Sequence, residues 1–353
     1  MLILKGESEG LLTVHVNIAN YSAWFNQISE YYMSDGYSDS AQQWNQQRQE
    51  VLQMALTEHL IPLMEKYIRE KLRIEAQEAI YDASYQSLMS KVNVGPFRGP
   101  DADRYKNGIP RVIAISSGNG DRNDPIVAVF LNHRGRLADR LEVPSLRDEK
   151  YSKQMIEFIS SKRPNVIGVA GFTAQTRLVY KNVQLLINDI NKSDSNLPTI
   201  DLLAVDDEAS RLYKNSKRAR DEFYELSEVT RYCISLARRL QCPVLEYTGL
   251  ERDLLALRHH EYQNLVPEDA LLIRLERALI NVVNDMGVDI NAASTSPHLA
   301  TALKYVCGLG PRKAQSILKK MDARVSHFLY LFFTRCNRGY LCICTYGLEN
   351  KKK

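Results

Sequence analysis

The sequence predicts a multidomain α+β protein, in which a mixed α/β domain lies between helical regions and a helix-hairpin-helix unit follows. Three observations predict this class. Residues 41–92 carry a helical apolar period, residues 111–205 alternate short β-favouring runs with helical segments, and residues 305–317 contain two closely spaced glycines. At 353 residues the chain exceeds one ordinary hydrophobic core, so two or three domains are expected.

The N-terminal part is expected to be helical. Apolar residues recur every three to four positions from Val51 to Met64 and continue to Ala83, with charged residues between them. Pro62 falls inside this pattern and should kink or divide the helix, because it has no N–H to donate. Residues 94–110 are rich in Gly, Pro, Asp and Arg, which predicts a boundary.

The middle part is expected to form a mixed sheet. β-favouring runs occupy residues 111–117, 126–131 and 136–143, and helical patterns follow at 150–161 and 176–190. Two buried-strand candidates lie at 166–170 and 200–205. A three-stranded meander followed by helix, strand, helix and strand is the order of the ribonuclease H-like fold, although other α+β folds share this order.

Helical patterns return at residues 231–240 and 268–286. The basic cluster at 214–220 is interpreted as a solvated face. His259 and His260 lie between the two helical patterns and are interpreted as structural residues.

Residues 305–317, Y-V-C-G-L-G-P-R-K-A-Q-S-I, predict the helix-hairpin-helix unit. The two glycines suit a turn with positive φ, Pro311 suits the first helical position, and Ala314 and Ile317 fall at packing positions. Free amides at that helix start, with two basic side chains beside them, can hold a phosphate without reading bases. The alternatives are a hairpin that packs only against protein and an ordinary Gly-terminated helix. The predicted nucleic-acid-binding residues are Gly308, Leu309, Gly310, Arg312 and Lys313.

Composition and short motifs limit the class of protein and the ligands that we expect. Hydrophobic residues make up 44% and charged residues 25% of the chain, as in ordinary globular proteins, and the net charge of +4 only weakly indicates nucleic acid. The six cysteines have no zinc or redox spacing, so reduced thiols are expected. No apolar run is long enough for a membrane span, and no P-loop, G-x-S-x-G or H-E-x-x-H motif occurs. We therefore expect no membrane, no cofactor and no small-molecule substrate.

The carboxylates expected of a ribonuclease H-like nuclease are not at the predicted strand ends. Such an enzyme holds two Mg²⁺ ions about 3.5–4 Å apart with acidic residues on its first strand, on its fourth strand and on a later element. Here the first strand offers Ser116 and Ser117, and the fourth offers Gly168, Ala170 and Gly171. Only Asp206, Asp207 and Glu208 retain negative charge after the fifth. We predict a degenerate site with no catalytic residue and no metal, in which the two aspartates begin a helix. The alternative is a metal-dependent nuclease of the ribonuclease H-like class that uses Asp206 or Asp207 with other partners.

Four motifs occur in order along the chain. They are V-D-D-E-A-S-R-L-Y-K-N-S (205–216), S-L-A-R-R-L-Q-C-P-V-L-E (235–246), M-G-V-D-I-N-A-A-S (286–294) and Y-V-C-G-L-G-P-R-K-A (305–314). Together they resemble the eukaryotic suppressor-of-Ty-six family, which comprises transcription elongation factors and histone chaperones related to bacterial Tex.

The resemblance implies a helical region at residues 1–104, a degenerate YqgF-type, ribonuclease H-like domain at 105–250 and a helix-hairpin-helix region at 251–321. It also implies a non-enzymatic role in chromatin maintenance during RNA polymerase II transcription, and a nuclear location. The implied partners are histones or nucleosomes, the polymerase elongation complex, and DNA or RNA backbone.

Residues 322–353 form an atypical tail that departs from the family pattern. The segment is aromatic and Cys-rich, lacks a helix or strand period of useful length, and stands where a second glycine hairpin is expected. It is interpreted either as a hydrophobic segment that packs on the core or as foreign sequence, such as a retained intron or a shifted frame. The family's acidic N-terminal region, S1 domain and tandem SH2 module are not found here, so we expect a fragment of a longer protein.

Overall fold

The fold is that of a computed structural model, which describes residues 1–99, 108–118, 124–171, 173–193, 200–322, 331–335 and 341–345. The chain divides into two compact units. One comprises Met1–Ser84 and His260–Ala270, and the other comprises Tyr85–His259 and Leu271–Lys353. The predicted boundary between residues 104 and 105 lies outside the described residues.

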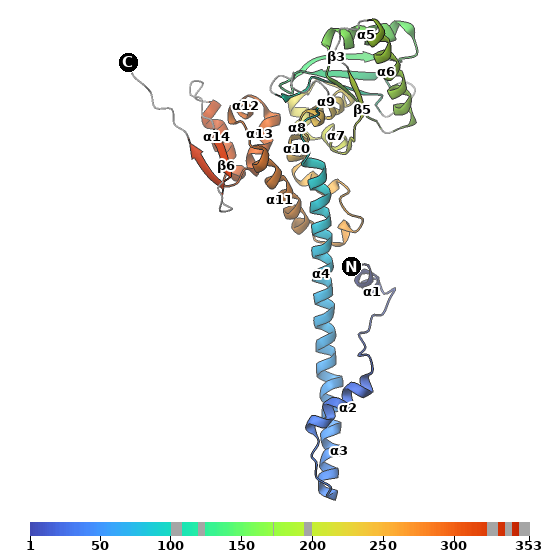
Figure 1. The fold of residues 1–353 in the computed structure, drawn as a ribbon, viewed down its shortest axis with the longest axis vertical. Helices are drawn as coiled ribbons and strands as arrows, with labels where there is room; N and C mark the ends of the chain where they lie inside the picture. Colours follow the sequence, from blue (N-terminus) through green and yellow to red (C-terminus); the bar gives the residue numbers. More distant parts are fainter. Residues whose placement is uncertain are drawn as a thin grey trace, which may run out of the picture. The chain divides into compact units, whose positions relative to one another are not determined.

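The first unit is helical, as the apolar period predicts (Figure 1). Its elements are α1 Leu2–Ser8, α2 Tyr21–Tyr32, α3 Asp39–Met54, a π-helical segment η1 Ala55–Leu60, most of α4 Ile61–Val92, and the 3₁₀ turn η5 Gln263–Leu265. α3 begins after Ser38, whose hydroxyl accepts the Ala41 N–H at 3.2 Å as an N-cap.

Pro62 lies two positions after the last residue of the π-helical segment. The Ile61 N–H donates to the Leu56 carbonyl, five residues back, so the chain winds more widely there than in an α-helix. Proline offers no N–H to the carbonyl four residues before it, which favours this local change of winding. The predicted interruption is therefore a π-helical segment between two α-helices.

The second unit contains one five-stranded sheet. Its strands are β1 Val112–Ser116, β2 Ile126–Leu131, β3 Leu137–Val143, β4 Val166–Val169 and β5 Asp201–Ala204, in the order β3-β2-β1-β4-β5. β2 is antiparallel to β1 and to β3, whereas β4 is parallel to β1 and to β5. This order confirms the ribonuclease H-like fold, and each predicted strand lies within one residue of its observed bounds.

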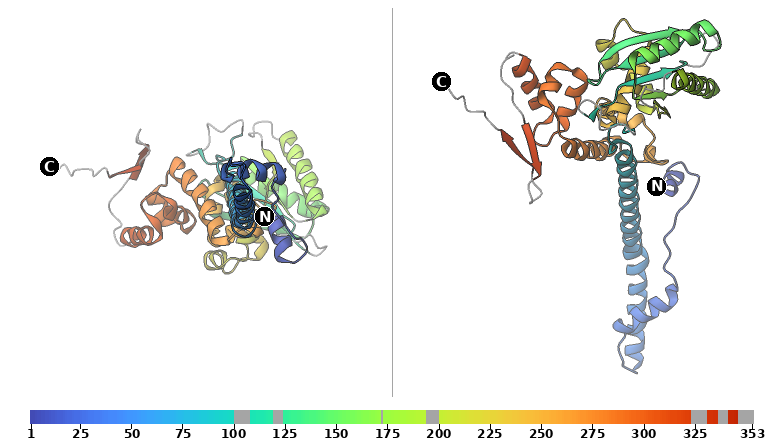
Figure 2. Two further views of the ribbon diagram at one scale, coloured as in Figure 1. Left: turned by 90° about the horizontal axis from the view of Figure 1, so that it is seen from below. Right: turned by 45° about the horizontal axis from the view of Figure 1, so that its top comes forward.

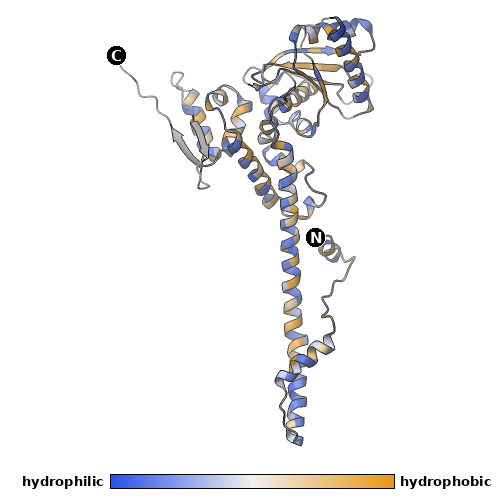
Figure 3. Cartoon of the chain, viewed as in Figure 1, coloured by the Kyte–Doolittle hydropathy of each residue, from blue (hydrophilic) through white to orange (hydrophobic). Residues whose placement is uncertain are grey.

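Both faces of the sheet are covered. On one face Ile113, Ile115 and Ile167 pack against α5 Glu149–Lys162 and α6 Ala174–Ser193, the green helices in Figure 2. On the other face Val112 and Ala114 pack against α9 Glu228–Gln241. Because both faces are buried, the inner strands are continuous apolar runs, and this apolar colouring is visible in Figure 3.

Short helices precede and follow α9 along the chain. They are α7 Glu208–Tyr213, α8 Lys217–Glu222, α10 Pro243–Thr248 and the 3₁₀ helix η4 Glu251–Ala256. α11 Glu268–Met286 follows and matches the predicted helix at 268–286. None of the helices in the described ranges is both long and apolar enough to cross a bilayer.

The hairpin region consists of α12 Ile290–Thr295, α13 Pro297–Ala300, the 3₁₀ helix η6 Thr301–Tyr305 and α14 Gly310–Asp322. Its small core contains Ile290, Leu303 and Ala314, and Ile317 packs against it. The predicted packing positions Ala314 and Ile317 are thus confirmed.

Two strands lie in the tail. β6 Leu331–Arg335 and β7 Leu341–Thr345 pair antiparallel as a separate two-stranded sheet. Residues 322–353 carry no strand period of useful length, and the two strands that form there have five residues each. The remainder of the tail beyond α14 lies outside the described residues.

Candidate nucleic-acid interface and the carboxyl edge of the sheet

The glycine turn between η6 and α14 has the predicted backbone geometry. Gly308 has φ of +84° and Gly310 has φ of +60°, a region that glycine enters without steric cost. The Leu309 N–H donates to the Val306 carbonyl at 3.1 Å, which closes the turn. α14 begins at Gly310, so Pro311 is its second residue, one position later than predicted.

A side chain that the sequence analysis did not single out holds this turn. Asn284, near the end of α11, donates to the Tyr305 carbonyl at 3.0 Å and accepts the Cys307 N–H at 3.0 Å. These two bonds fix the backbone directly before the glycines. No sequence signal distinguishes Asn284 from any other polar residue on a helix, because its partners are backbone groups more than 20 residues away.

The five predicted nucleic-acid-binding residues do not all reach the surface. Arg312 and Lys313 are exposed, and the Lys313 ammonium donates to the Gly308 carbonyl at 3.0 Å, so its charge lies beside the turn. Leu309 is only 8% exposed, and its N–H is already bonded. The turn can therefore bind an anion through the first backbone amides of α14 and through the two cationic side chains, while Leu309 contributes to packing.

The charge around the turn favours an anion. No Asp or Glu occurs between Tyr305 and Met321, whereas Lys319 and Lys320 add positive charge later in α14. A helix start, with its free N–H groups and its positive dipole end, attracts phosphate.

The serines at the end of β1 are buried. Ser116 has no exposed area, Ser117 is 6% exposed, and neither hydroxyl has a hydrogen-bond partner among the described residues. Because β1, β4 and β5 are parallel, their C-terminal ends share one edge of the sheet. The residues that follow β5 are therefore two strand spacings from the serines, about 10 Å along that edge.

Both oxygens of each remaining carboxylate are engaged. Asp206 accepts the Glu208 N–H at 3.2 Å through Oδ1 and a bond from Arg239 at 3.0 Å through Oδ2. Asp207 accepts the Tyr232 hydroxyl at 2.6 Å and forms an ion pair with Arg211 at 2.8 Å. These donors, two of them arginines, already neutralise the carboxylates and compete with a divalent cation for them.

The predicted helix-start role of the two aspartates is divided between them. Asp207 occupies the N-cap position of α7 but its side chain makes no cap bond, whereas Asp206 accepts the first helical N–H. Burial and the hydrogen bond to Asp207 raise the pKa of Tyr232, so that phenol stays protonated and continues to donate.

Gly168 on β4 has no room for an acidic side chain. A Cβ built there would lie 2.7 Å from Leu240 Cδ1 and 3.0 Å from Val205 Cγ2. The close packing of α9 on the sheet therefore requires the glycine that the sequence shows in place of a carboxylate.

The basic cluster at 214–220 is not entirely solvated, which corrects the sequence-based interpretation. The Arg218 side chain is 19% exposed, and its guanidinium lies 4.7 Å from the centre of the Tyr213 ring. The short helix α8 directs this face inward, and the neighbouring Ala219 has no exposed area.

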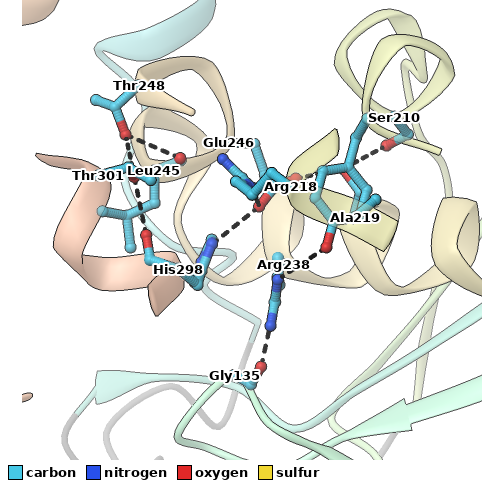
Figure 4. Close-up of polar contacts among 12 residues, drawn as sticks. Gly135, Ser210, Arg218, Ala219, Arg238, Leu245, Glu246, Thr248, His298 and Thr301 are labelled. Atoms are coloured by element: carbon cyan, nitrogen blue, oxygen red, sulfur yellow. Dashed lines mark hydrogen bonds and ion pairs between the residues drawn. The ribbon is translucent and has the colours of Figure 1, made fainter. Parts of the chain in front are cut away.

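Arg218 belongs to a buried polar network that joins the ribonuclease H-like domain to the hairpin region (Figure 4). At its centre is Glu246 on α10, with a side chain 1% exposed. Its Oε1 lies 3.5 Å from Arg218 and 3.2 Å from Nδ1 of His298 on α13, and its Oε2 accepts the Ser235 hydroxyl. Thr248 and Thr301 add a hydroxyl contact of 2.9 Å across the same junction.

A second ion pair lies beside this network and contacts the turn between β2 and β3. Arg238 binds both oxygens of Glu222, at 2.5 and 3.0 Å, and donates to the Gly135 carbonyl at 3.3 Å. Burial opposes the charge of Glu222, but the hydrogen bond and charge of Arg238 outweigh it and lower the pKa of that carboxyl. Burial, with the nearby charges of Arg238 and Arg218, holds the pKa of His298 well below its usual range, so this imidazole is neutral.

His259 has a structural role, as interpreted. It is 8% exposed, and its Nε2 lies 3.0 Å from the Leu254 carbonyl. Burial lowers the pKa of this imidazole as well.

Comparison with known proteins matches both domains. Residues 106–251 match the YqgF family described as Holliday-junction resolvase-like of SPT6, and residues 252–329 match a helix-hairpin-helix motif family. The transcription elongation factor spt6 of Schizosaccharomyces pombe is 36% identical over 322 residues, which are 91% of this chain and 23% of that protein. Its counterpart in Candida albicans is 32% identical over 342 residues, which are 93% of this chain and 24% of that protein.

A third relative, the transcription elongation factor SPT6 of Gibberella zeae, is 32% identical over 333 residues. The chain thus spans about a quarter of the length of these curated relatives. The sheet order agrees with the resolvase-like match, and the glycine turn agrees with the helix-hairpin-helix match. The chain belongs to the family of SPT6 transcription elongation factors, whose resolvase-like and helix-hairpin-helix segments it contains.

Proposed function

We propose that the chain is the non-enzymatic core of a transcription elongation factor and histone chaperone, which holds nucleic-acid backbone at the turn of residues 308–313. The proposed setting is the nucleus, on chromatin that RNA polymerase II transcribes. Membership of the family supports this role, since its curated relatives carry the name transcription elongation factor. The observation that carries the nucleic-acid part is the glycine turn that brings free amides and two exposed cations together.

The chemistry of this surface favours phosphate over bases. The turn offers backbone N–H groups and cations, which bind phosphate oxygens irrespective of sequence. It offers no exposed amide or carboxylate side chain within 308–313 that could read a base edge. Asn284 and the Lys313 contact with Gly308 hold the turn in one conformation, which lowers the entropy lost on binding.

A non-enzymatic role is supported by the carboxyl edge of the sheet. Serines stand at the end of β1, and packing excludes a larger residue at Gly168. The two aspartates that follow β5 already accept bonds from arginine and tyrosine. We propose that the domain serves as a docking surface and that histones or nucleosomes and the polymerase elongation complex are its protein partners.

The test of nucleic-acid binding removes two charges from the turn. The Arg312→Ala/Lys313→Ala double variant is compared with Lys150→Ala/Lys153→Ala, which removes the same charge from the exposed side of α5. Affinity for a fluorescent DNA or RNA is measured by anisotropy across a salt series. Each lost phosphate contact should reduce the slope of log affinity against log salt by about 0.9 on duplex DNA and about 0.7 on single strands.

The turn variant should bind more weakly, with a slope lower by up to about 1.8 on duplex DNA, whereas the α5 variant should retain most of the parent's affinity. Equal binding by the parent and the turn variant at every salt concentration would refute the assignment. Incubation with Mg²⁺ or Mn²⁺ and branched, duplex and single-stranded substrates tests the non-enzymatic role. Cleavage that disappears in Asp206→Asn would establish the nuclease instead.

A further inference from the structure

The outer face of α14 carries four cations. Arg312, Lys313, Lys319 and Lys320 are all exposed, and no Asp or Glu occurs between residues 305 and 321. Seven residues make nearly two helical turns, so Lys319 lies on the same side of the helix as Arg312, and Lys320 on the same side as Lys313. Two pairs of cations therefore lie about 10 Å apart along the helix axis.

This charged face is opposite the face through which α14 packs. At 3.6 residues per turn, the helix places its apolar residues on one side and Arg312, Ser316 and Lys319 on the other. The cations can therefore meet a partner from solvent while the helix stays packed on the core of the hairpin region. The packed residues are Ala314, Ile317, Leu318 and Met321.

The cations of this face have no acidic partners. Apart from Lys313, which donates to the Gly308 carbonyl, they form no hydrogen bond or ion pair with another described residue. By contrast, Lys304 in the preceding 3₁₀ helix lies 2.5 Å from a carboxylate oxygen of Glu251. The positive charge of α14 is therefore available to an external anion.

The position of the first pair favours a bound anion. Arg312 and Lys313 are the third and fourth residues of α14, where the positive end of the helix dipole disfavours a cation. A phosphate held by the first amides of the helix would offset this unfavourable arrangement. Lys319 and Lys320 lie near the other end of the helix, where the dipole favours cations.

An exposed serine lies between the two pairs. Ser316 is four residues after Arg312, three residues before Lys319 and four before Lys320, so these side chains are its neighbours on the helix surface. Its hydroxyl forms no hydrogen bond with another described residue. Serine hydroxyls, like arginine and lysine side chains, commonly donate to phosphate oxygens. The face thus offers donors at its middle as well as at both ends.

We propose that nucleic-acid backbone runs along this outer face of α14, with one phosphate at the glycine turn and Arg312 and another at Lys319 and Lys320. One phosphate group cannot reach two positions about 10 Å apart, whereas a strand carries a phosphate on every nucleotide. The ligand is therefore a continuous strand of DNA or RNA rather than a free nucleotide or a single terminal phosphate. This inference rests on the proposed function of the turn and adds a second contact outside residues 308–313.

Lys319→Ala/Lys320→Ala tests the second contact, beside the turn variant and the α5 variant. Anisotropy of a fluorescent oligonucleotide of about 15 nucleotides is measured across a salt series. The slope of log affinity against log salt should fall by up to about 1.4 on a single strand and about 1.8 on a duplex. Near about 0.15 M salt, the same loss weakens binding roughly tenfold or more, whereas the α5 variant should retain most of the parent's affinity. Because both lysines are exposed and alanine favours helix, the variant should fold as the parent does, which circular dichroism checks.

A matched pair of variants tests the middle of the face. Ser316→Glu adds a carboxylate beside the cations at both ends, whereas Ser316→Gln adds an uncharged side chain of the same size. If phosphates lie along this face, Ser316→Glu should bind roughly fourfold or more weakly than Ser316→Gln near about 0.15 M salt. Equal affinities of these two variants would contradict the proposal.

The outcomes separate this inference from the proposed function. If Lys319→Ala/Lys320→Ala binds as the parent does at every salt concentration while the turn variant binds more weakly, only the contact along α14 is wrong. Parental binding by both variants would refute the proposed function as well.

Competition tests the class of ligand. Unlabelled oligonucleotide should displace the fluorescent strand, whereas a mononucleotide at about 1 mM should displace little of it. Displacement by the mononucleotide as effective as that by the oligonucleotide would indicate a site for a single phosphate. Equally effective displacement by polyglutamate of the same charge would indicate a surface for acidic protein segments, and either result would overturn the proposal.

Discussion

Replacement of Glu246 tests what attaches the hairpin region to the ribonuclease H-like domain. Glu246→Ala removes the carboxylate that faces Arg218 and His298 and leaves the Arg218 side chain, 19% exposed, without that acid. Removing one partner of a buried ion pair costs about 3–5 kcal/mol. Because Arg218 retains some solvent and its contact with Tyr213, we expect a cost near the lower limit, about 3 kcal/mol.

Glu246→Gln separates the contribution of the side-chain charge from that of the side-chain volume. The amide retains the volume of the side chain and can still accept the Ser235 hydroxyl, but it no longer offers a charge to Arg218. Hydrogen bonds to charged groups contribute about 1.5–3 kcal/mol and neutral ones about 0.5–1.5 kcal/mol, so the expected cost is about 1 kcal/mol. A double-mutant cycle with Arg218→Met should give a coupling free energy of about 0.5–3 kcal/mol.

The assay must report on the junction. Both tryptophans, Trp24 and Trp44, lie in the first unit, so tryptophan fluorescence does not follow it. Native-state hydrogen exchange resolved by peptides from α10 and α13 measures the local opening free energy directly. Glu149→Gln is the control, because this residue pairs with Lys153 while 83% exposed, and it should change that free energy by less than about 0.5 kcal/mol.

The reasoning fails if Glu246→Ala leaves exchange in α10 and α13 as slow as in the parent. It also fails if the cycle gives no coupling, because the contact would then lack an energetic role. A loss of protection throughout the sheet would show instead that the network stabilises the whole second unit rather than the junction.

Two further predictions concern pH and packing. The folded pKa of His298 lies below its unfolded value of about 6.5, so its contribution is intact above that pH and is lost as the pH falls toward the folded pKa. At pH values below about 6.5, the free energy of unfolding should therefore decrease by up to about 1.4 kcal/mol per pH unit, and by less in His298→Gln. Urea titrations at pH 7.5 to 5.5 measure this dependence, and an equal dependence on pH in the parent and in His298→Gln would contradict the prediction. Gly168→Ala should cost about 1–3 kcal/mol, because its Cβ would meet Leu240 at 2.7 Å. Gly95→Ala, with nothing within 4 Å of its Cβ, should melt close to the parent, and equal melting temperatures for both variants would refute the packing argument.

The elements themselves were largely predictable, because their signals are local. The buried strands β1, β2 and β4 are short apolar runs between turn residues, and the helix at 268–286 carries a clear apolar period. The glycine turn was predictable because positive φ strongly favours glycine. The strands β6 and β7 were missed, since each has five residues and their pairing partner is not visible from local periodicity.

The contacts of the candidate sites were not predictable from local patterns. Asn284 reaches the turn from a separate helix, and Tyr232 reaches Asp207 from α9 on the face of the sheet. Arg218 lies in a basic cluster that resembles a solvated surface, yet it faces Glu246, 28 positions later in the chain. Each of these contacts joins residues that only packing brings together.

The sequence by itself determined where the strands, helices and glycine turn lie, and that serines and a glycine stand where a nuclease needs acids. It did so because backbone preference and side-chain identity are properties of each residue and its neighbours along the chain. Only the tertiary structure decided which charges are buried, which carboxylates are already bonded, and which hydroxyls are buried without a partner. Those properties depend on solvent exclusion and on distances between elements, which arise only when the sheet and its covering helices pack.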